Sequence, residues 1–319
     1  MKKQMVGVCL AGIMLLSALS GCASSPKNQE SSTPEHVYTF TDDLGREVTV
    51  DHPQRVAALL GSYADLWVLA GGELCAATDD AWEDFDLPLD EDTVNLGVLK
   101  QLSLEALLSS RPDFVLASSN TTQHLEWKEA LEGAGIPVAY FDVAEFEDYL
   151  HMLKICTDIT GDSQSYQTNG VEVQEQVEGV LQRSREEMDP DDPQTVLVLR
   201  TSSSSVRAKN SQGTVLGEML AKLGYIKIAD QDGSLLEDLS MEGILAANPD
   251  KIFVVTMGDN EEAAYANLES TLASNPLWQQ LDAVQEGHVY YMDRHLYNMK
   301  PNDQWGEAYA HLEELLFQD

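Results

Sequence analysis

The chain has 319 residues, of which 54 are acidic and 19 are Lys or Arg, so its formal net charge is −35. This charge argues against a nucleic-acid partner, because nucleic-acid phosphates attract basic proteins. The carboxylates are spread along the chain and therefore indicate no metal site by themselves. After residue 36 no segment is apolar and long enough to span a bilayer, and the remaining residues, roughly 280, suit two lobes better than one small core.

The N-terminus has the pattern of an export signal. Lys2 and Lys3 precede an apolar stretch at residues 6–19, which is shorter than an ordinary membrane span. The sequence LSGC at residues 19–22 then resembles the lipobox of bacterial lipoproteins, in which the cysteine is diacylated and becomes the mature N-terminus. The alternative is an ordinary signal peptide that happens to contain a cysteine.

We therefore predict a lipoprotein signal peptide at residues 1–21 and lipidation of Cys22. Residues 22–36 are rich in Ser, Pro, Asn and Gln, so they are predicted to form a flexible tether after the lipidated cysteine. Two or three acyl chains would hold the protein permanently on a membrane. The predicted location is outside the cytoplasm, lipid-anchored to the bacterial cell membrane.

Residues 37–144 are predicted to form an N-terminal α/β lobe. Val37–Val50 reads as a β-hairpin around an Asp-Leu-Gly turn. Beyond it, strands and helices alternate, and this alternation predicts a parallel sheet covered on both faces. The predicted strands are Arg55–Leu60, Leu74–Thr78, Phe114–Ser118 and Val138–Phe141, and the predicted helices are Tyr63–Ala70, Ser103–Ser109 and Thr122–Ala134.

Residues 145–190 carry no strand signal and are predicted to be a helical connector, with a break at Gly161-Asp162. Residues 191–319 are predicted to form a second α/β lobe. Its predicted strands are Thr195–Arg200, Lys251–Thr256 and His288–Met292, and its predicted helices are Val215–Leu223 and Trp305–Phe317. The predicted fold class is therefore α/β, with two parallel-sheet lobes joined by a long helix and a ligand cleft between the lobes.

An internal repeat supports two similar lobes. Residues 102–116 (LSLEALLSSRPDFVL) and residues 239–253 (LSMEGILAANPDKIF) match without a gap, and six of the fifteen positions are identical. Each copy starts with Ser as an N-cap, carries Glu in the first turn, and breaks at Pro-Asp before an apolar run. The alternative is a coincidence between two ordinary helix–strand units.

The sequence leaves the redox state of two cysteines open. Cys75 and Cys156 could form a disulfide outside the cell or remain as free thiols, and their spacing does not decide between these states.

The sequence lacks the common catalytic motifs. No phosphate-binding glycine loop, nucleophile elbow or HExxH helix is present. The serines at residues 202–205 have no committed base beside them. We therefore predict a binding protein and not an enzyme.

The chain resembles the substrate-binding lipoproteins of ABC importers for iron complexes and cobalamin. The segments YTFTDDLGREVTV, the paired SLEALL…RPDFVLA and SMEGIL…NPDKIFVV units, and NPLWQQLDAVQEGHVYYMD…KPNDQWGEAY carry this resemblance, from Val37 to Phe317. It implies two lobes bridged by a long helix. It also implies a monomer that delivers its ligand to a permease dimer with its ATPase.

The resemblance implies roles for particular residues but names no single ligand. Glu105 and Glu242 stand where family members pair with arginines of the permease, and both also suit a helix N-terminus. The ligand is expected to be a ferric siderophore, with haem or a corrinoid as alternatives, and no intrinsic cofactor is expected. A surface haem-relay lipoprotein without a transporter is a further alternative.

The cleft is expected to be lined by loops at the carboxyl ends of the strands. Several of the few basic residues fall in these loops, which indicates an anionic ligand. The seven histidines after residue 35 are too scattered for a bare-metal site, although His295, Tyr297 or Met257 could be axial haem ligands. The candidate ligand residues are Tyr63, Trp82, Asn120, Arg200, Arg207, Lys209, Met257, Arg294, His295, Tyr297 and Lys300.

Overall fold

The structure is a computed structural model, and it describes residues 37–317 with the exception of residues 190, 238 and 259. The predicted signal peptide, Cys22 and the tether lie outside these residues. Residues 36–319 form one compact unit. Within the described part of the chain, no helix has both the length and the apolar character needed to cross a membrane.

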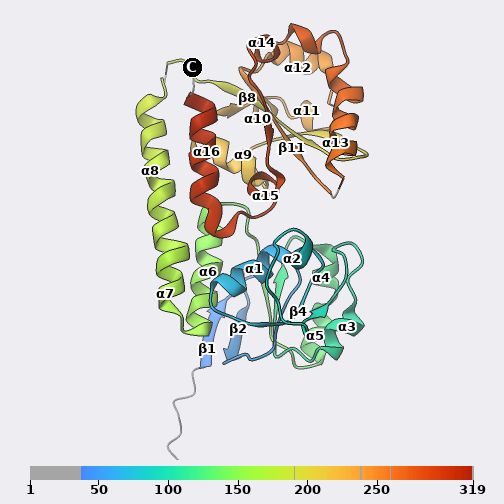
Figure 1. Ribbon diagram of the computed structural model, residues 1–319, viewed down its shortest axis with the longest axis vertical. Helices are drawn as coiled ribbons and strands as arrows, with labels where there is room; N and C mark the ends of the chain where they lie inside the picture. Colours follow the sequence, from blue (N-terminus) through green and yellow to red (C-terminus); the bar gives the residue numbers. More distant parts are fainter. Residues whose placement is uncertain (1–36, 190, 238, 259, 318–319) are drawn as a thin grey trace, which may run out of the picture. The chain divides into compact units, whose positions relative to one another are not determined.

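The N-terminal lobe, coloured blue and green in Figure 1, is built on a five-stranded parallel sheet in the order β5-β4-β3-β6-β7. All five residues of β6 are buried, which is expected for a central strand covered on both faces. The predicted hairpin is confirmed as an antiparallel pair. The strands are β1 (Val37–Thr41), β2 (Glu47–Asp51), β3 (Val56–Ala58), β4 (Leu74–Ala77), β5 (Val94–Asn95), β6 (Phe114–Ser118) and β7 (Val138–Phe141), and the helices are α1 (Gly61–Leu69), α2 (Asp80–Glu83), α3 (Leu104–Ser109), α4 (Thr122–Glu126) and α5 (Lys128–Gly133).

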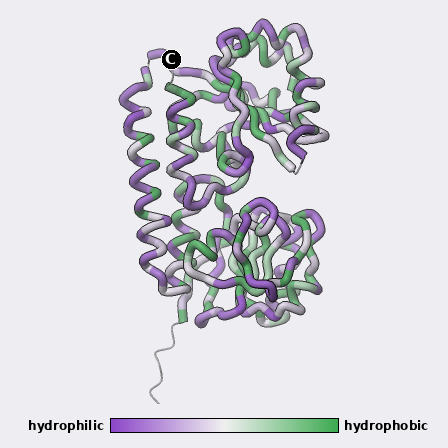
Figure 2. The backbone as a smooth tube through the Cα atoms, viewed as in Figure 1, coloured by the Kyte–Doolittle hydropathy of each residue, from purple (hydrophilic) through white to green (hydrophobic). Residues whose placement is uncertain are grey.

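The C-terminal lobe has a second sheet with parallel strands in the order β10-β8-β11-β12. In addition, β9 pairs with β8 in the antiparallel sense, where the sequence predicted a loop. Hydrophobic positions concentrate in the strands of both lobes (Figure 2). The strands are β8 (Thr195–Thr201), β9 (Val206–Lys209), β10 (Ile226–Lys227), β11 (Lys251–Thr256) and β12 (Val289–Met292), and the helices are α9 (Val215–Lys222), α10 (Ile228–Gln231), α11 (Ser234–Glu237), α12 (Met241–Ala247), α13 (Glu261–Leu268), α14 (Asp282–Gln285) and α15 (Arg294–Tyr297).

The serine run before β9 forms the turn that creates this hairpin. The backbone N–H of Ser202 donates to the carbonyl oxygen of Ser205 at 2.8 Å. The Ser202 hydroxyl oxygen in turn accepts from the backbone N–H of Ser205 at 3.1 Å. These local side-chain bonds stabilise a tight turn, so the hydroxyls serve the backbone.

The connector consists of two helical segments. The first, α6 (Phe146–Thr160), ends at Gly161, whose positive φ of 79° gives the left-handed C-cap that glycine favours. The second comprises α7 (Ser163–Tyr166), a π-helical turn (Gln167–Val171) and α8 (Glu172–Glu187). It runs alongside α16 (Trp305–Phe317), to which the pair Arg183–Glu313 joins it at 2.7 Å (Figure 1). The helical break therefore falls where the sequence predicted it.

The two copies of the internal repeat adopt the same local structure. The Ser103 and Ser240 hydroxyls each accept from the backbone N–H three residues later at 3.1 Å, and so cap α3 and α12. The Asp113 carboxylate accepts from the N–H groups of residues 54 and 55 at 2.8 and 2.9 Å, beside β3. The Asp250 carboxylate accepts from the N–H of Thr195 at 2.6 Å, at the start of β8. Each Pro-Asp break therefore ties its strand to the neighbouring strand of its sheet.

A buried histidine beneath β6 is expected to make stability depend on pH. His124 is fully buried, and its Nδ1 accepts from the backbone N–H of Ser118 at 3.0 Å. Burial lowers the pKa of His124 from 6.5 to about 4. The unfolded state therefore binds more protons between these values, so the free energy of unfolding falls as the pH falls through this window.

We expect His124→Asn to remove most of this pH dependence, since the amide oxygen can accept the same hydrogen bond. The wild type should lose about 2–3 kcal/mol more than the variant between pH 7 and pH 4.5. Urea unfolding at several pH values measures the difference, with the exposed His52→Asn as the control. Equal slopes in wild type and His124→Asn would exclude His124 as the cause.

Candidate functional site

Side chains from the two lobes meet at the carboxyl ends of their sheets. Arg294, which follows β12, forms an ion pair with Asp84, which follows α2. The ring of the neighbouring Phe85 packs edge-on against His295, with 4.8 Å between the ring centroids. Loops at the carboxyl ends of parallel strands commonly form binding sites, so this junction, here called the interlobe site, is the candidate functional site.

Three basic residues form a cation cluster on one side of this junction. Arg200 of β8 lies directly opposite Arg207 of β9 in the antiparallel register. Lys209 is two residues beyond Arg207 and therefore lies on the same face. In the part of the chain that the structure describes, none of the three forms an ion pair with a carboxylate.

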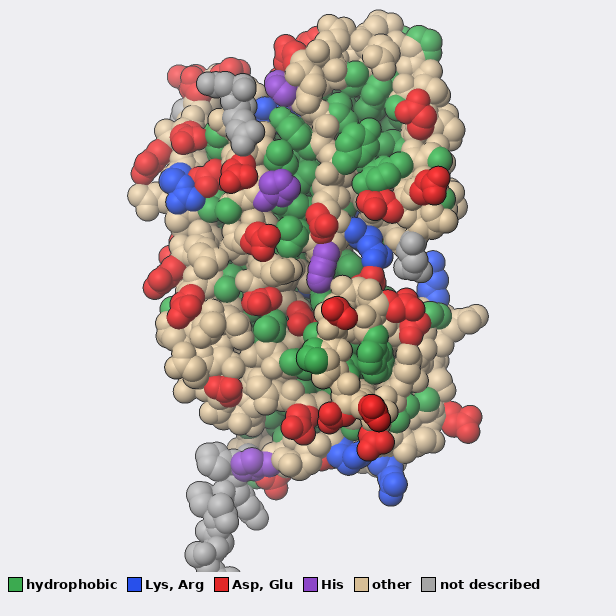
Figure 3. Space-filling view, in the orientation of Figure 1, with side chains coloured by type: hydrophobic (Ala, Val, Ile, Leu, Met, Phe, Trp, Pro, Cys, Tyr) green, Lys and Arg blue, Asp and Glu red, His purple; other side chains and the backbone are tan. Residues whose placement is uncertain are grey.

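The cluster is electrostatically unsatisfied. Burial lowers the pKa of Arg200, and it lowers the pKa of Lys209, which the charges of Arg200 and Arg207 depress further. A bound anion would relieve this repulsion by charge-assisted hydrogen bonds. On the face shown in Figure 3, some of the Lys and Arg side chains lie near the junction of the lobes, and Asp and Glu side chains are spread over the rest of the surface.

The segment before α16 joins the C-terminal part of the chain to the N-terminal lobe. Lys300 is half-buried, and burial lowers its pKa, although the Asp142 carboxylate beyond β7 acts in the opposite direction. Asn302 donates from Nδ2 to the Ser62 carbonyl oxygen at 2.8 Å and to Asp65 Oδ2 at 2.7 Å. These contacts fix the segment that carries Lys300 against α1 of the N-terminal lobe.

Two of the predicted ligand residues need correction, because they lie in the core. Tyr63 is 2% exposed, and its hydroxyl donates to the carbonyl oxygen of Phe141 at 2.8 Å. Tyr297 is 1% exposed, and its hydroxyl donates to the carbonyl oxygen of Ala308 at 2.9 Å. Both rings pack against neighbouring elements and offer no surface to a ligand in this structure.

The remaining predicted ligand residues lie at the ends of strands in both lobes. Trp82 is half-buried in α2, and Asn120, beyond β6, is exposed. Met257 is 39% exposed directly after β11. His295 is half-buried, and its Nδ1 has no hydrogen-bond partner among the described residues. The structure thus supplies aromatic, apolar and cationic groups, which a bulky amphiphilic chelate requires.

Sequence reasoning missed Asp84 and Phe85 as members of the site. They follow closely after Trp82, which was among the predicted ligand residues. Asp80 itself accepts from the backbone N–H of Gly61 at 2.9 Å, and a Cβ on Gly61 would lie 2.8 Å from that carboxylate. Gly61 therefore allows the α2 segment to approach α1 closely. The acidic, aromatic composition after β4 is the signal that could have extended the prediction.

Glu105 and Glu242 occupy equivalent places on the two lobes. Each is exposed and lies in the first turn of its helix, two residues after the capping serine. Among the described residues neither forms an ion pair. Both carboxylates are therefore accessible to a partner.

The described residues contain two free cysteines and no cluster of side chains suited to a metal ion. Cys75 and Cys156 are free thiols. Burial raises the pKa of both thiols, which disfavours their reactive thiolate form. No group of three or more His, Cys, Asp or Glu side chains within this part of the chain is arranged to hold a metal ion.

Comparison with known proteins agrees with this architecture. The Periplasmic binding protein family model matches residues 56–296. The chain therefore belongs to this family, whose members serve ABC transporters of iron complexes, siderophores and haem. Proteins of this family bind their ligands without transforming them, so the chain is a binding protein and not an enzyme.

Individual relatives and a solved structure indicate which kind of periplasmic binding protein the chain resembles. The putative ABC transporter substrate-binding lipoprotein YhfQ of Bacillus subtilis is 25% identical over 317 residues, covering 94% of this chain and 93% of YhfQ. The Fe(3+)-citrate-binding protein YfmC of the same organism is 23% identical over 296 residues, covering 90% of this chain and 89% of YfmC. Staphylococcus aureus SirA, solved with staphyloferrin B, has a TM-score of 0.68 at 21% identity, covering 88% of this chain and 98% of SirA. The chain is thus the substrate-binding protein of an ABC importer, a class that works with a permease and a chelate ligand.

Proposed function

We propose that this protein captures an anionic ferric chelate of the carboxylate type between its lobes and delivers it to the permease. The observation that carries this proposal is the cation cluster of Arg200, Arg207 and Lys209. Among the described residues none of these three cations pairs with a carboxylate, although the chain has a net charge of −35. Carboxylates are the natural complement of guanidinium groups, which bind them through two parallel hydrogen bonds.

Two similar proteins support a ferric chelate as the ligand. YfmC is a Fe(3+)-citrate-binding protein by name, and SirA was solved with staphyloferrin B. The half-buried Trp82 and the Phe85–His295 pair would add apolar contact beside the charged groups. The family also includes haem receptors, and His295, whose Nδ1 has no hydrogen-bond partner in the described part of the chain, makes haem the second candidate.

Delivery is proposed to use the two outer glutamates and the N-terminal anchor. Glu105 and Glu242 would contact basic residues on the permease, and the lipid on Cys22 would keep the protein at the membrane surface. A short tether raises the effective concentration of the protein near the permease, so weak contacts suffice for docking. The core that joins both lobes to α6, α8 and α16 favours modest lobe movement on binding.

A tryptophan-fluorescence titration of the mature chain beginning after Cys22 tests the ligand class. The panel comprises ferric citrate, haem, cobalamin, and ferric hydroxamate and catecholate chelates. We expect saturable sub-micromolar quenching by ferric citrate, and Trp82→Phe should reduce the signal while the affinity measured by calorimetry falls only slightly, because Phe keeps an aromatic contact. Saturation by haem or cobalamin alone would reject the carboxylate class and retain the importer function.

A further inference from the structure

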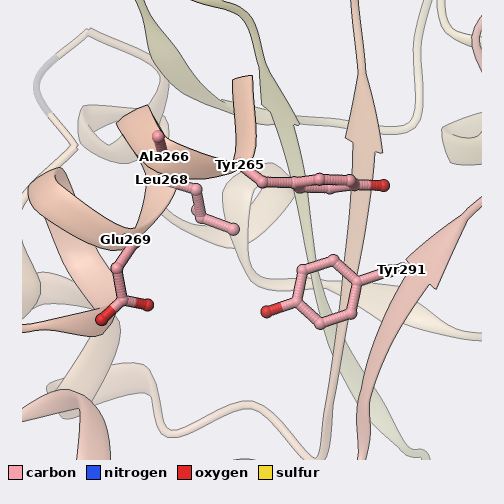
Figure 4. Close-up of a pocket in the computed structure, with 5 residues that line it drawn as sticks. All are labelled: Tyr265, Ala266, Leu268, Glu269 and Tyr291. Atoms are coloured by element: carbon pink, nitrogen blue, oxygen red, sulfur yellow. The ribbon is translucent and has the colours of Figure 1, made fainter. Parts of the chain in front are cut away.

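A separate cavity of about 490 Å³ lies on the C-terminal lobe (Figure 4). It lies between α13 and the neighbouring edge strand β12, and none of the candidate ligand residues lines it. Its floor includes the buried Leu268, and its walls include two tyrosines from different elements. The lining residues are Tyr265, Ala266, Leu268, Glu269 and Tyr291.

The two tyrosines provide an aromatic corner open to solvent. Their rings are nearly perpendicular, with 5.3 Å between the centroids. Tyr291 is 58% exposed even though its ring contacts Tyr265, so much of this aromatic side chain remains open to solvent. The hydroxyl of Tyr265 donates to Glu261 at 2.9 Å, so this half-buried ring is held in place.

The charge around the cavity is negative. Glu269 lines it, and Glu261 and Asp293 lie close enough to raise the pKa of the Tyr265 phenol to about 12, after burial as the main cause. No Lys or Arg belongs to the lining set. Aromatic faces beside a carboxylate are the chemistry that recognises organic cations.

The backbone departs from regular helix where it presents Glu269. The α-helix α13 gives way at this residue to the π-helical turn Glu269–Ala273. Such π-helical turns are rare and frequently mark functional sites. The widened turn places the exposed Glu269 next to the buried Leu268, so that one wall is anionic and the floor is apolar (Figure 4).

We propose that this cavity is a second binding site, for a small organic cation that carries an alkylammonium or guanidinium group. The cationic group would lie over the Tyr291 or Tyr265 ring, with Glu269 as its counter-charge. The volume of the cavity is larger than that of a single side chain and falls within the size range of small-molecule binding sites. The site is chemically opposite to the cation cluster, so the two sites would select ligands of opposite charge.

A two-dimensional NMR titration of the mature chain with choline tests the proposal, and 3,3-dimethyl-1-butanol serves as the uncharged isostere. Choline should shift the amide signals of residues 265–269 and 291 saturably, whereas the isostere should not. Tyr291→Leu and Glu269→Gln should each weaken the affinity at least fivefold. Glu262→Gln is the matched control, because Glu262 is an exposed carboxylate on α13 outside the lining, and it should leave the affinity unchanged.

Three outcomes would overturn the proposal. Equal binding of the isostere would show that charge plays no part. Unchanged affinity in both Tyr291→Leu and Glu269→Gln would place the cation elsewhere, and both substitutions concern exposed side chains. Saturable shifts at these residues with an arginine-rich peptide, but with neither choline nor methylguanidinium, would assign the cavity to a protein partner instead.

Discussion

Neutralising Arg200 and Arg207 together is expected to weaken ferric citrate binding at least 100-fold. Hydrogen bonds to charged groups contribute about 1.5–3 kcal/mol each, so the loss of two corresponds to about 3–6 kcal/mol. Each 1.4 kcal/mol changes the dissociation constant about tenfold. Calorimetric titration of Arg200→Gln with Arg207→Gln measures the effect, and Lys209→Gln should add a smaller loss.

The same titration contains its own controls. Arg183→Gln removes an exposed guanidinium that pairs with Glu313 far from the interlobe site, so it should leave affinity intact. Wild-type affinity should fall as ionic strength rises, and the double variant should show a weaker salt dependence. Full affinity in the double variant would contradict a carboxylate-binding role for the cluster.

Removing both outer glutamates is expected to stop uptake while ligand binding continues. Exposed ion pairs contribute only about 0–1 kcal/mol each, so a single substitution should have a modest effect. The two contacts act together to orient the protein on its permease, so Glu105→Ala with Glu242→Ala should reduce ligand uptake by cells more than tenfold. Charge reversal to Lys at both positions should abolish it.

A matched pair of exposed acids separates docking from general charge. Glu129 in α5 and Glu286 beyond α14 are exposed, and their substitution by Ala changes the net charge equally. That control pair should transport normally. If the Glu105/Glu242 variant lost ligand affinity in vitro, or if it transported at the wild-type rate, the docking role would be wrong.

Local sequence signals predicted most of the helices and strands. The two copies of the internal repeat show the physical reason. Ser103 and Ser240 cap their helices through identical contacts, and Asp113 and Asp250 bind the neighbouring strand in the same way. These interactions span a few residues or adjacent strands, so the pattern alone indicates them. The break at Gly161 was equally visible, because only glycine adopts its positive φ without strain.

Features that depend on tertiary packing were not predictable. The strand β9 reads VRAK, which has little apolar content, and it forms because the preceding serine turn returns the chain to β8. The predicted helix at residues 122–134 divides at Trp127, although no Gly or Pro marks the break. Tyr63 lies in α1 and Tyr297 in α15, both just beyond the end of a strand, but a position in the sequence does not reveal which way the ring points.

The residues of the candidate site also differ in how far the sequence alone could indicate them. Arg200, Arg207 and Lys209 could be chosen as candidates from the sequence because basic residues are few and these lie at or after the end of a predicted strand. Their common face was not, because it arises from the antiparallel register of β8 and β9. The contact between Asp84 and Arg294 joins residues 210 positions apart and depends on how the lobes pack.

The most direct test of the account is an iron anomalous difference map from crystals of the mature protein grown with ferric citrate. The account predicts one strong peak between the lobes, with the chelate carboxylates on the guanidinium groups of Arg200 and Arg207. A peak bound directly by protein side chains, or a peak away from the interlobe site, would contradict it.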